Sequence, residues 1–155
     1  MYKGYGTILI TGKTGSGKTC FLIKYLNKVI NDENSLFYIM DNTNNEFYEY
    51  KDRNNVIYIS LIDDFNEMIY NSIKNDKNDK KKYLFINDYS EFRLQEEYHK
   101  KVKNLMYNRE EYSLDLAMAS TNKNSFCNGM KASADMVLNI NNWRTEKTCK
   151  WEDLF

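Results

Sequence analysis

The feature that most constrains this chain is an eight-residue run, Gly12-Lys13-Thr14-Gly15-Ser16-Gly17-Lys18-Thr19, which matches the phosphate-loop pattern G-x-x-x-x-G-K-T in full. Its glycines permit the backbone conformations that turn successive N–H groups toward phosphate oxygens. A helix that begins near Lys18 would add the positive end of its dipole at the same place. The Lys18 ammonium can reach the β- and γ-phosphates, and the Thr19 hydroxyl can ligate a magnesium ion. We therefore expect this run to bind ATP and Mg²⁺.

The segments on either side of the run are those that its mechanism requires. Thr7–Thr11 (TILIT) predicts a strand before the loop. Lys18–Ile30 predicts a helix after it, because its apolar residues recur at the i, i+3, i+4, i+7 spacing of one buried face. Cys20 follows the motif directly, so we count it among the expected nucleotide contacts. We expect its side chain to be a small buried helix residue rather than a redox switch.

Short apolar runs alternate with amphipathic or polar stretches along the chain, which is typical of a parallel sheet with crossover helices. Strands are predicted at Thr7–Thr11, Leu36–Met40, Val56–Ser60, Tyr83–Ile86, Leu116–Ala119 and Met136–Ile140. Helices are predicted at Lys18–Ile30, from Asp63 or Asp64 to Lys74, and at Glu91–Tyr107. The sequence therefore predicts an α/β fold in which helices flank a mostly parallel central sheet on both faces.

Length and charge narrow the classes of protein further. A chain of 155 residues suits one domain, with residues 142–155 as a candidate C-terminal extension. Lysine and arginine together number 22, as do aspartate and glutamate, which argues against a basic nucleic-acid coat but not against a local basic channel. No apolar run approaches the ~18–20 residues of a membrane helix, and no signal-peptide layout opens the chain. With three scattered cysteines, these features favour a cytoplasmic protein, in the host cytoplasm if the chain is viral, with reduced thiols.

A second acidic site is expected at the end of the buried strand Tyr83–Ile86, which is followed by Asn87-Asp88. In one alignment, Asp88 is the carboxylate on the magnesium side and Tyr89 stands where a catalytic glutamate often lies. In the other, which the length of the apolar run slightly favours, Asn87 replaces the magnesium-side aspartate and Asp88 polarises the attacking water. Thr19, Asn87 and Asp88 are therefore the candidate metal-side residues, with Glu91 as a reserve carboxylate. If Asn87 faces the magnesium shell, Asn87→Asp is expected to raise turnover.

The stretch from Leu84 to Phe92 (LFINDYSEF) resembles the Walker B segment of FtsK/HerA-type ATPases, in which an apolar strand ends in Asp-Glu. Residues 102–121 are similar to that group's helix, arginine, short turn and strand with a polar tip, which here reads Ser120-Thr121-Asn122. Residues 131–140 resemble the closing strand of the group. Viral genome-packaging ATPases and filamentous-phage assembly ATPases belong to the same broad group. Here the usual Asp-Glu pair is incomplete, which puts fast hydrolysis in doubt.

The resemblance implies a RecA-like core that assembles as a ring, usually a hexamer, and moves double-stranded DNA. It also implies that Asn122 orients the attacking water or senses the γ-phosphate, and that Arg109 serves the ATP site of a neighbouring subunit. With Asp88, whose role differs between the two alignments, these are the candidate catalytic residues. DNA contacts would come from the lysines of the solvated loop Lys74–Lys82 and from Lys123 with Lys131. His99, the single histidine, is expected to face solvent.

Three classes of function remain open at this point. The first is a small oligomeric ATPase that translocates or packages DNA. The second is a non-catalytic ATP-binding switch whose occupancy is read by a partner protein, a reading that Asn87-Asp88 keeps open. The third is a nucleotide or small-molecule kinase, which the four scattered arginines disfavour. A GTPase is the least favoured class, because Asn122-Lys123-Asn124-Ser125 lacks the aspartate that would grip a guanine ring.

Overall fold

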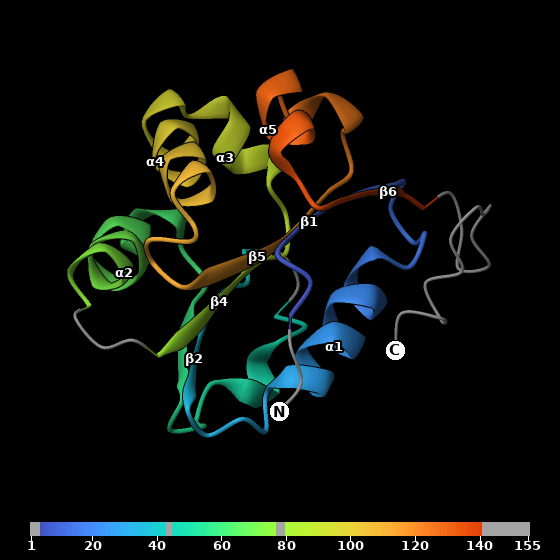
Figure 1. Ribbon diagram of the computed structural model, residues 1–155. Helices are drawn as coiled ribbons and strands as arrows, with labels where there is room; N and C mark the ends of the chain where they lie inside the picture. Colours follow the sequence, from blue (N-terminus) through green and yellow to red (C-terminus); the bar gives the residue numbers. More distant parts are fainter. Residues whose placement is uncertain (1–3, 43–44, 77–79, 141–155) are drawn as a thin grey trace.

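Six parallel strands form the central sheet of the described residues, in the order β3-β2-β4-β5-β1-β6 (Figure 1). The computed structural model describes residues 4–42, 45–76 and 80–140. The strands are β1 (Thr7–Thr11), β2 (Ser35–Met40), β3 (Val56–Ile59), β4 (Lys81–Ile86), β5 (Leu114–Ser120) and β6 (Met136–Asn139). The predicted α/β fold and the six predicted strands are confirmed. The candidate extension at 142–155 lies outside the described residues.

Helices cover both faces of this sheet. They are α1 (Lys18–Val29), α2 (Asn71–Asn75), α3 (Ser90–Leu94), α4 (Glu96–Tyr107) and α5 (Asn128–Ser133). Short 3-10 turns occur at η1 (Tyr48–Tyr50), η2 (Ile62–Asp64) and η4 (Lys123–Ser125), and a π-helical turn, η3, spans Asn66–Tyr70. No helix in the described part of the chain is long and apolar enough to cross a bilayer.

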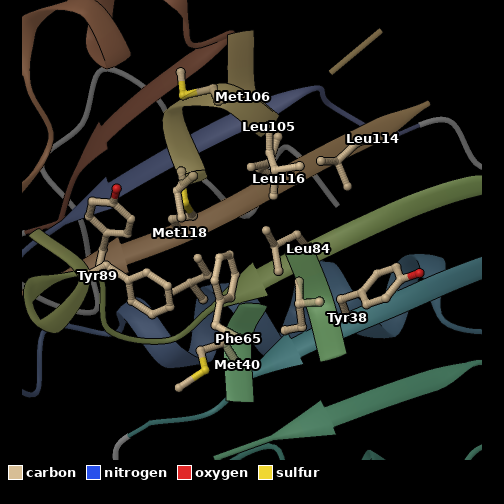
Figure 2. Packing of buried hydrophobic residues seen from close by; sticks show 14 of the residues in the cluster. Tyr38, Met40, Phe65, Leu84, Tyr89, Leu105, Met106, Leu114, Leu116 and Met118 are labelled. Carbon is tan, nitrogen blue, oxygen red and sulfur yellow. The ribbon is translucent and has the colours of Figure 1, made fainter. Parts of the chain in front are cut away.

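The core is divided in two by the sheet, because successive side chains of a strand point to opposite faces. In β1, Leu9 packs with residues of η3, α2, α3 and α4, whereas Ile8 and Ile10 pack with α1 and η1. Figure 2 shows the first of these layers, in which Leu105 and Met106 of α4 lie over strand residues such as Leu116 and Met118. Both faces are therefore buried, which is why the strands appear as continuous apolar runs in the sequence.

The predicted helix Glu91–Tyr107 is interrupted, which corrects the sequence prediction. Gln95 is extended, with φ −115° and ψ 102°, and separates α3 from α4. Across this break, Phe92 of α3 and His99 of α4 both pack on the ring of Tyr89, with centroids 5.6 and 5.8 Å away.

Two lysines of the predicted solvated loop are instead part of the sheet. Lys81 and Lys82 open β4, and Lys82 is only 2% exposed. The Lys82 ammonium donates to the carbonyls of Lys80 and Tyr112, both at 3.1 Å, and lies 3.3 Å from the Asp76 carboxylate. These two lysines are thus not part of a solvated loop, and residues 77–79 of that loop lie outside the described residues.

Candidate nucleotide-binding site

The phosphate loop connects the carboxyl end of β1 to the first turn of α1, as the sequence predicted. Gly17 lies at the N-cap of α1 with φ +106°, a left-handed conformation that side-chain-bearing residues rarely adopt. Gly12 has no room for a side chain, since a Cβ there would collide with the Ile140 carbonyl and the Ser16 hydroxyl. The Ser16 hydroxyl is buried and has no hydrogen-bond partner among the described residues. A loop with an unused donor and backbone N–H groups at a helix start fits a phosphate group.

Lys18 lines a small cavity beside this loop. The cavity has a volume of ≈ 190 Å³ and is lined by Thr14, Gly15, Lys18, Thr19, Glu46, Asn87, Asp88 and Thr121. The Lys18 ammonium donates to the Lys13 carbonyl at 2.9 Å. Burial lowers the pKa of Lys18 from its usual value, an effect that the negative charges of Asp88 and Glu46 oppose. The lysine is thus a buried cation with two carboxylates facing it.

Asn87 and Asp88 come from the carboxyl end of β4 and take different positions in the site. The Thr19 hydroxyl donates to the Asn87 carbonyl oxygen at 3.2 Å. The Asp88 carboxylate accepts the Ser90 N–H at 2.9 Å and stays on the cavity wall. Asn42 fixes the Asp88 backbone, donating to its carbonyl at 2.9 Å and accepting its N–H at 3.2 Å. Asn87 is thus the residue of the pair that contacts Thr19.

Tyr89, the next residue, points away from the cavity. It is fully buried, and its hydroxyl lies 2.7 Å from Nδ1 of His99. Burial raises the pKa of Tyr89 and lowers that of His99 to about 4. His99 is only 4% exposed, so the expectation that it faces solvent is wrong. The break at Gln95, which turns α4 back over Tyr89, is the cause.

Asp41, a carboxylate that follows β2, also belongs to this site, although the sequence did not predict it. It is 1% exposed and accepts hydrogen bonds from the Tyr58 hydroxyl at 2.8 Å and the Phe47 N–H at 3.0 Å. Its other oxygen accepts the Asn87 amide N–H at 3.3 Å. The register that pairs Met40 with Ile86 sets Asp41 beside Asn87. The available signal was a polar residue at the carboxyl end of a strand that neighbours β4.

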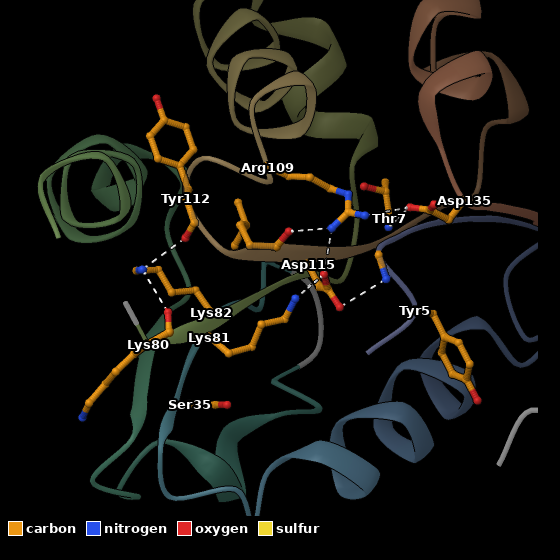
Figure 3. Close-up of polar contacts among 12 residues, drawn as sticks. Tyr5, Thr7, Ser35, Lys80, Lys81, Lys82, Arg109, Tyr112, Asp115 and Asp135 are labelled. Carbon is orange, nitrogen blue, oxygen red and sulfur yellow. Dashed lines mark hydrogen bonds and ion pairs between the residues drawn. The ribbon is translucent and has the colours of Figure 1, made fainter. Parts of the chain in front are cut away.

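Other predicted site residues lie elsewhere. Arg109 lies at the amino-terminal ends of the strands, opposite the phosphate loop. There it contacts the Asp115 carboxylate at 3.1 Å and the Asp135 carboxylate at 3.5 Å (Figure 3). Asn122 is exposed, and its side-chain oxygen accepts the Asn124 N–H at 2.9 Å. Thr121 is the residue of that strand tip that lines the cavity. Cys20 is exposed on α1, so the expectation of a buried side chain is wrong.

Comparison with protein families identifies the group to which this site belongs. The model of the family described as Novel STAND NTPase 3 matches residues 1–148. The chain belongs to this nSTAND3 family. It is therefore a P-loop NTPase. A comparison with curated proteins gives no match.

Solved structures share the fold at low sequence identity. The cytoplasmic domain of EssC is 17% identical with a TM-score of 0.68, and the match covers 99% of this chain and 34% of that one. ATPases 2 and 3 of EccC from Thermomonospora curvata are 13% identical with a TM-score of 0.74, and the match covers 96% of this chain and 34% of that one. B204, the DNA-packaging ATPase of Sulfolobus Turreted Icosahedral Virus, is 14% identical with a TM-score of 0.69, and the match covers 88% of this chain and 76% of that one. This nSTAND3 chain thus has a RecA-like P-loop fold, and it spans about a third of the EssC and EccC chains.

Proposed function

We propose that this protein binds Mg²⁺ and ATP in the phosphate-loop cavity and hydrolyses ATP slowly. The observation that carries the proposal is the contact of Thr19 with Asn87 on one side of the cavity, while Asp88 and Lys18 line it together. In this arrangement Thr19 and Asn87 hold the magnesium side, and Lys18 with the loop N–H groups holds the phosphates. Asp88 is the carboxylate that orients the attacking water and accepts its proton.

The metal side explains why hydrolysis should be slow. Magnesium prefers oxygen ligands, and a carboxylate attracts it more strongly than a neutral amide does. Asn87 contributes an amide oxygen where this class of enzyme ordinarily has a carboxylate. The bound magnesium neutralises charge that develops on the phosphates during transfer, so a weaker metal side lowers the rate.

Two variants test the hydrolysis proposal, with radioactive ATP as substrate and a fluorescent ATP analogue as binding probe. Lys18→Ala should abolish binding or turnover. Asp88→Asn should lower turnover roughly 10²–10⁴-fold while it retains binding, the range for loss of a general base. Asp63→Asn is the matched control, because it makes the same change of side chain at an exposed position of η2 that does not line the cavity. Turnover by Asp88→Asn equal to that of the unchanged chain would contradict the proposed role.

We further propose that the ATPase works as an oligomer, a ring such as a hexamer, that translocates or packages double-stranded DNA, with a partner protein that recruits it. The fold that it shares with the DNA-packaging ATPase B204 supports this proposal. In the ring, Arg109 serves the neighbouring subunit's ATP and Asn122 senses the γ-phosphate. Hydrolysis measured against protein concentration, with and without DNA, is the test. Turnover should rise steeply with concentration and again with DNA.

The second candidate function is an ATP-binding switch that does not hydrolyse ATP, and one observation favours it. The carboxylate that accepts a hydrogen bond from Asn87, that of Asp41, is buried and does not line the cavity. Tight ATP binding with negligible turnover, at every protein concentration and with or without DNA, would support the switch over the motor.

A further inference from the structure

We propose that Asp41 is a positioning residue for the magnesium side of the site, and that it supplies from β2 the negative charge that Asn87 lacks. The inference rests on the proposed binding of Mg²⁺ and ATP. Asp41 acts through Asn87 and does not itself line the cavity.

The Asp41 carboxylate lies among hydrogen-bond donors. It is 1% exposed, and among the described residues it accepts hydrogen bonds from the Tyr58 hydroxyl, the Phe47 N–H and the Asn87 amide N–H. An ionised carboxylate only accepts hydrogen bonds, so this surrounding suits the charged form. Burial and the neighbouring Asp41 raise the pKa of Tyr58, which keeps its hydroxyl a donor.

Asp41 selects one orientation of the Asn87 amide. The Thr19 hydroxyl can donate or accept a hydrogen bond, so Thr19 alone would tolerate either face of the amide. Asp41 only accepts, and it therefore requires the NH₂ group on its own side. The amide oxygen is then directed at Thr19, as its 3.2 Å contact shows. Magnesium needs an oxygen in that position, because an NH₂ group offers it no lone pair.

A structural role alone does not account for a charge at Asp41. Burial deprives a carboxylate of its hydration, a free-energy cost that its hydrogen bonds must offset, and an apolar or amide side chain would avoid that cost. Asp41 also receives the Phe47 N–H, and the preceding residue, Glu46, lines the cavity. One buried charge thus orients two parts of the cavity wall, Asn87 and the segment that carries Glu46.

Variants that move the carboxylate from position 41 to position 87 test the inference. The proteins compared are the unchanged chain, Asp41→Asn, Asn87→Asp and the double variant Asp41→Asn/Asn87→Asp. Affinity for a fluorescent ATP analogue is measured with magnesium and with EDTA, and thermal unfolding is measured without nucleotide. Tyr58→Phe is the matched control, since it removes a different hydrogen bond of Asp41 and leaves the Asn87 contact in place.

Asp41→Asn should weaken magnesium-dependent affinity roughly 10–100-fold and leave affinity in EDTA unchanged, as loss of a ligand's partner does at other metal sites. Asn87→Asp should unfold at a lower temperature, because it places two carboxylates side by side in a buried position. The double variant should recover the unfolding temperature and the magnesium dependence, since one charge is again present. Tyr58→Phe should change the unfolding temperature only.

Two results would overturn the pairing of Asp41 with Asn87. They are unchanged magnesium dependence in Asp41→Asn, and a double variant whose loss of stability is the sum of the two single losses. A chain that binds the analogue equally with magnesium and with EDTA would instead refute the proposed magnesium site, and the unfolding cycle would still measure the coupling of the two residues. The two failures are therefore distinguishable.

Discussion

Replacing Arg109 by alanine separates a structural role from a role at a neighbouring subunit's ATP site. In the structure the guanidinium donates to the Asp115 carboxylate at 3.1 Å and to the Leu114 carbonyl at 3.3 Å. Asp115 is 2% exposed, and it also accepts the Lys81 ammonium at 2.6 Å and the Gly6 N–H at 3.1 Å. The network joins the starts of β1, β4 and β5 at the amino edge of the sheet (Figure 3).

The size of the effect follows from these contacts. A hydrogen bond to a charged group contributes about 1.5–3 kcal/mol, and a buried carboxylate left without any partner would cost more. Lys81 remains bound to Asp115, so the carboxylate does not lose its last cation. The contact with Asp135, whose side chain is 46% exposed, contributes little. We therefore expect Arg109→Ala to lower the free energy of unfolding by about 2 kcal/mol, or the Tm by about 4–8 °C.

Urea unfolding of the isolated chain measures this loss. Arg109→Lys should recover part of it, and Arg93→Ala is the control, because Arg93 is exposed on α3. A change below about 0.5 kcal/mol in Arg109→Ala, the usual size for a surface substitution, would refute the reasoning from the network. The role of Arg109 at a neighbouring subunit's ATP site has a separate readout, since hydrolysis by Arg109→Ala that still rises with protein concentration would contradict it.

Two further predictions concern His99 and Cys20. Burial lowers the pKa of His99 to about 4. Between about pH 6.5 and 4, the unfolded chain therefore binds a proton at His99 that the folded chain does not bind. The free energy of unfolding should fall as the pH falls through this window, with a limiting slope of about 1.4 kcal/mol per pH unit. His99→Gln should remove this component from urea unfolding measured across the window, and an identical slope would contradict it. Cys20 is exposed on α1, so its alkylation can be followed in a variant whose other cysteines are replaced by serine. If Cys20 contacts the nucleotide, ATP with magnesium should slow this alkylation. Equal alkylation rates with and without ATP would exclude the contact.

The strands were predictable because parallel strands buried on both faces leave continuous apolar runs. The ends of the strands were less predictable from the sequence where polar residues take part in the sheet. Lys81 and Lys82 extend β4, and Asp115 lies within β5, but each polar side chain is accommodated by partners that only the folded chain brings together. The helix α5 was missed, because its six residues are too few to show a helical period.

The phosphate loop was predictable because its residues are contiguous in the sequence. Asp41 was not, because its relation to Asn87 depends on the register of two strands that are far apart in the sequence. His99 was misjudged for a related reason, since charged neighbours in the sequence suggest a solvated face while the break at Gln95 turns it inward. Local chemistry thus identifies the site, and tertiary pairing determines the environment of each charge.

The substitution Asn87→Asp shows how the structure changes a sequence-based expectation. The sequence alone predicts that this carboxylate raises turnover, because it restores the usual acid on the magnesium side. The structure adds Asp41, whose oxygen lies 3.3 Å from the Asn87 amide nitrogen, so the single variant would bring two buried carboxylates together. The gain in turnover should therefore require Asp41→Asn as well. Higher turnover in Asn87→Asp alone, with an unchanged unfolding temperature, would contradict the proposed pairing of Asp41 with Asn87.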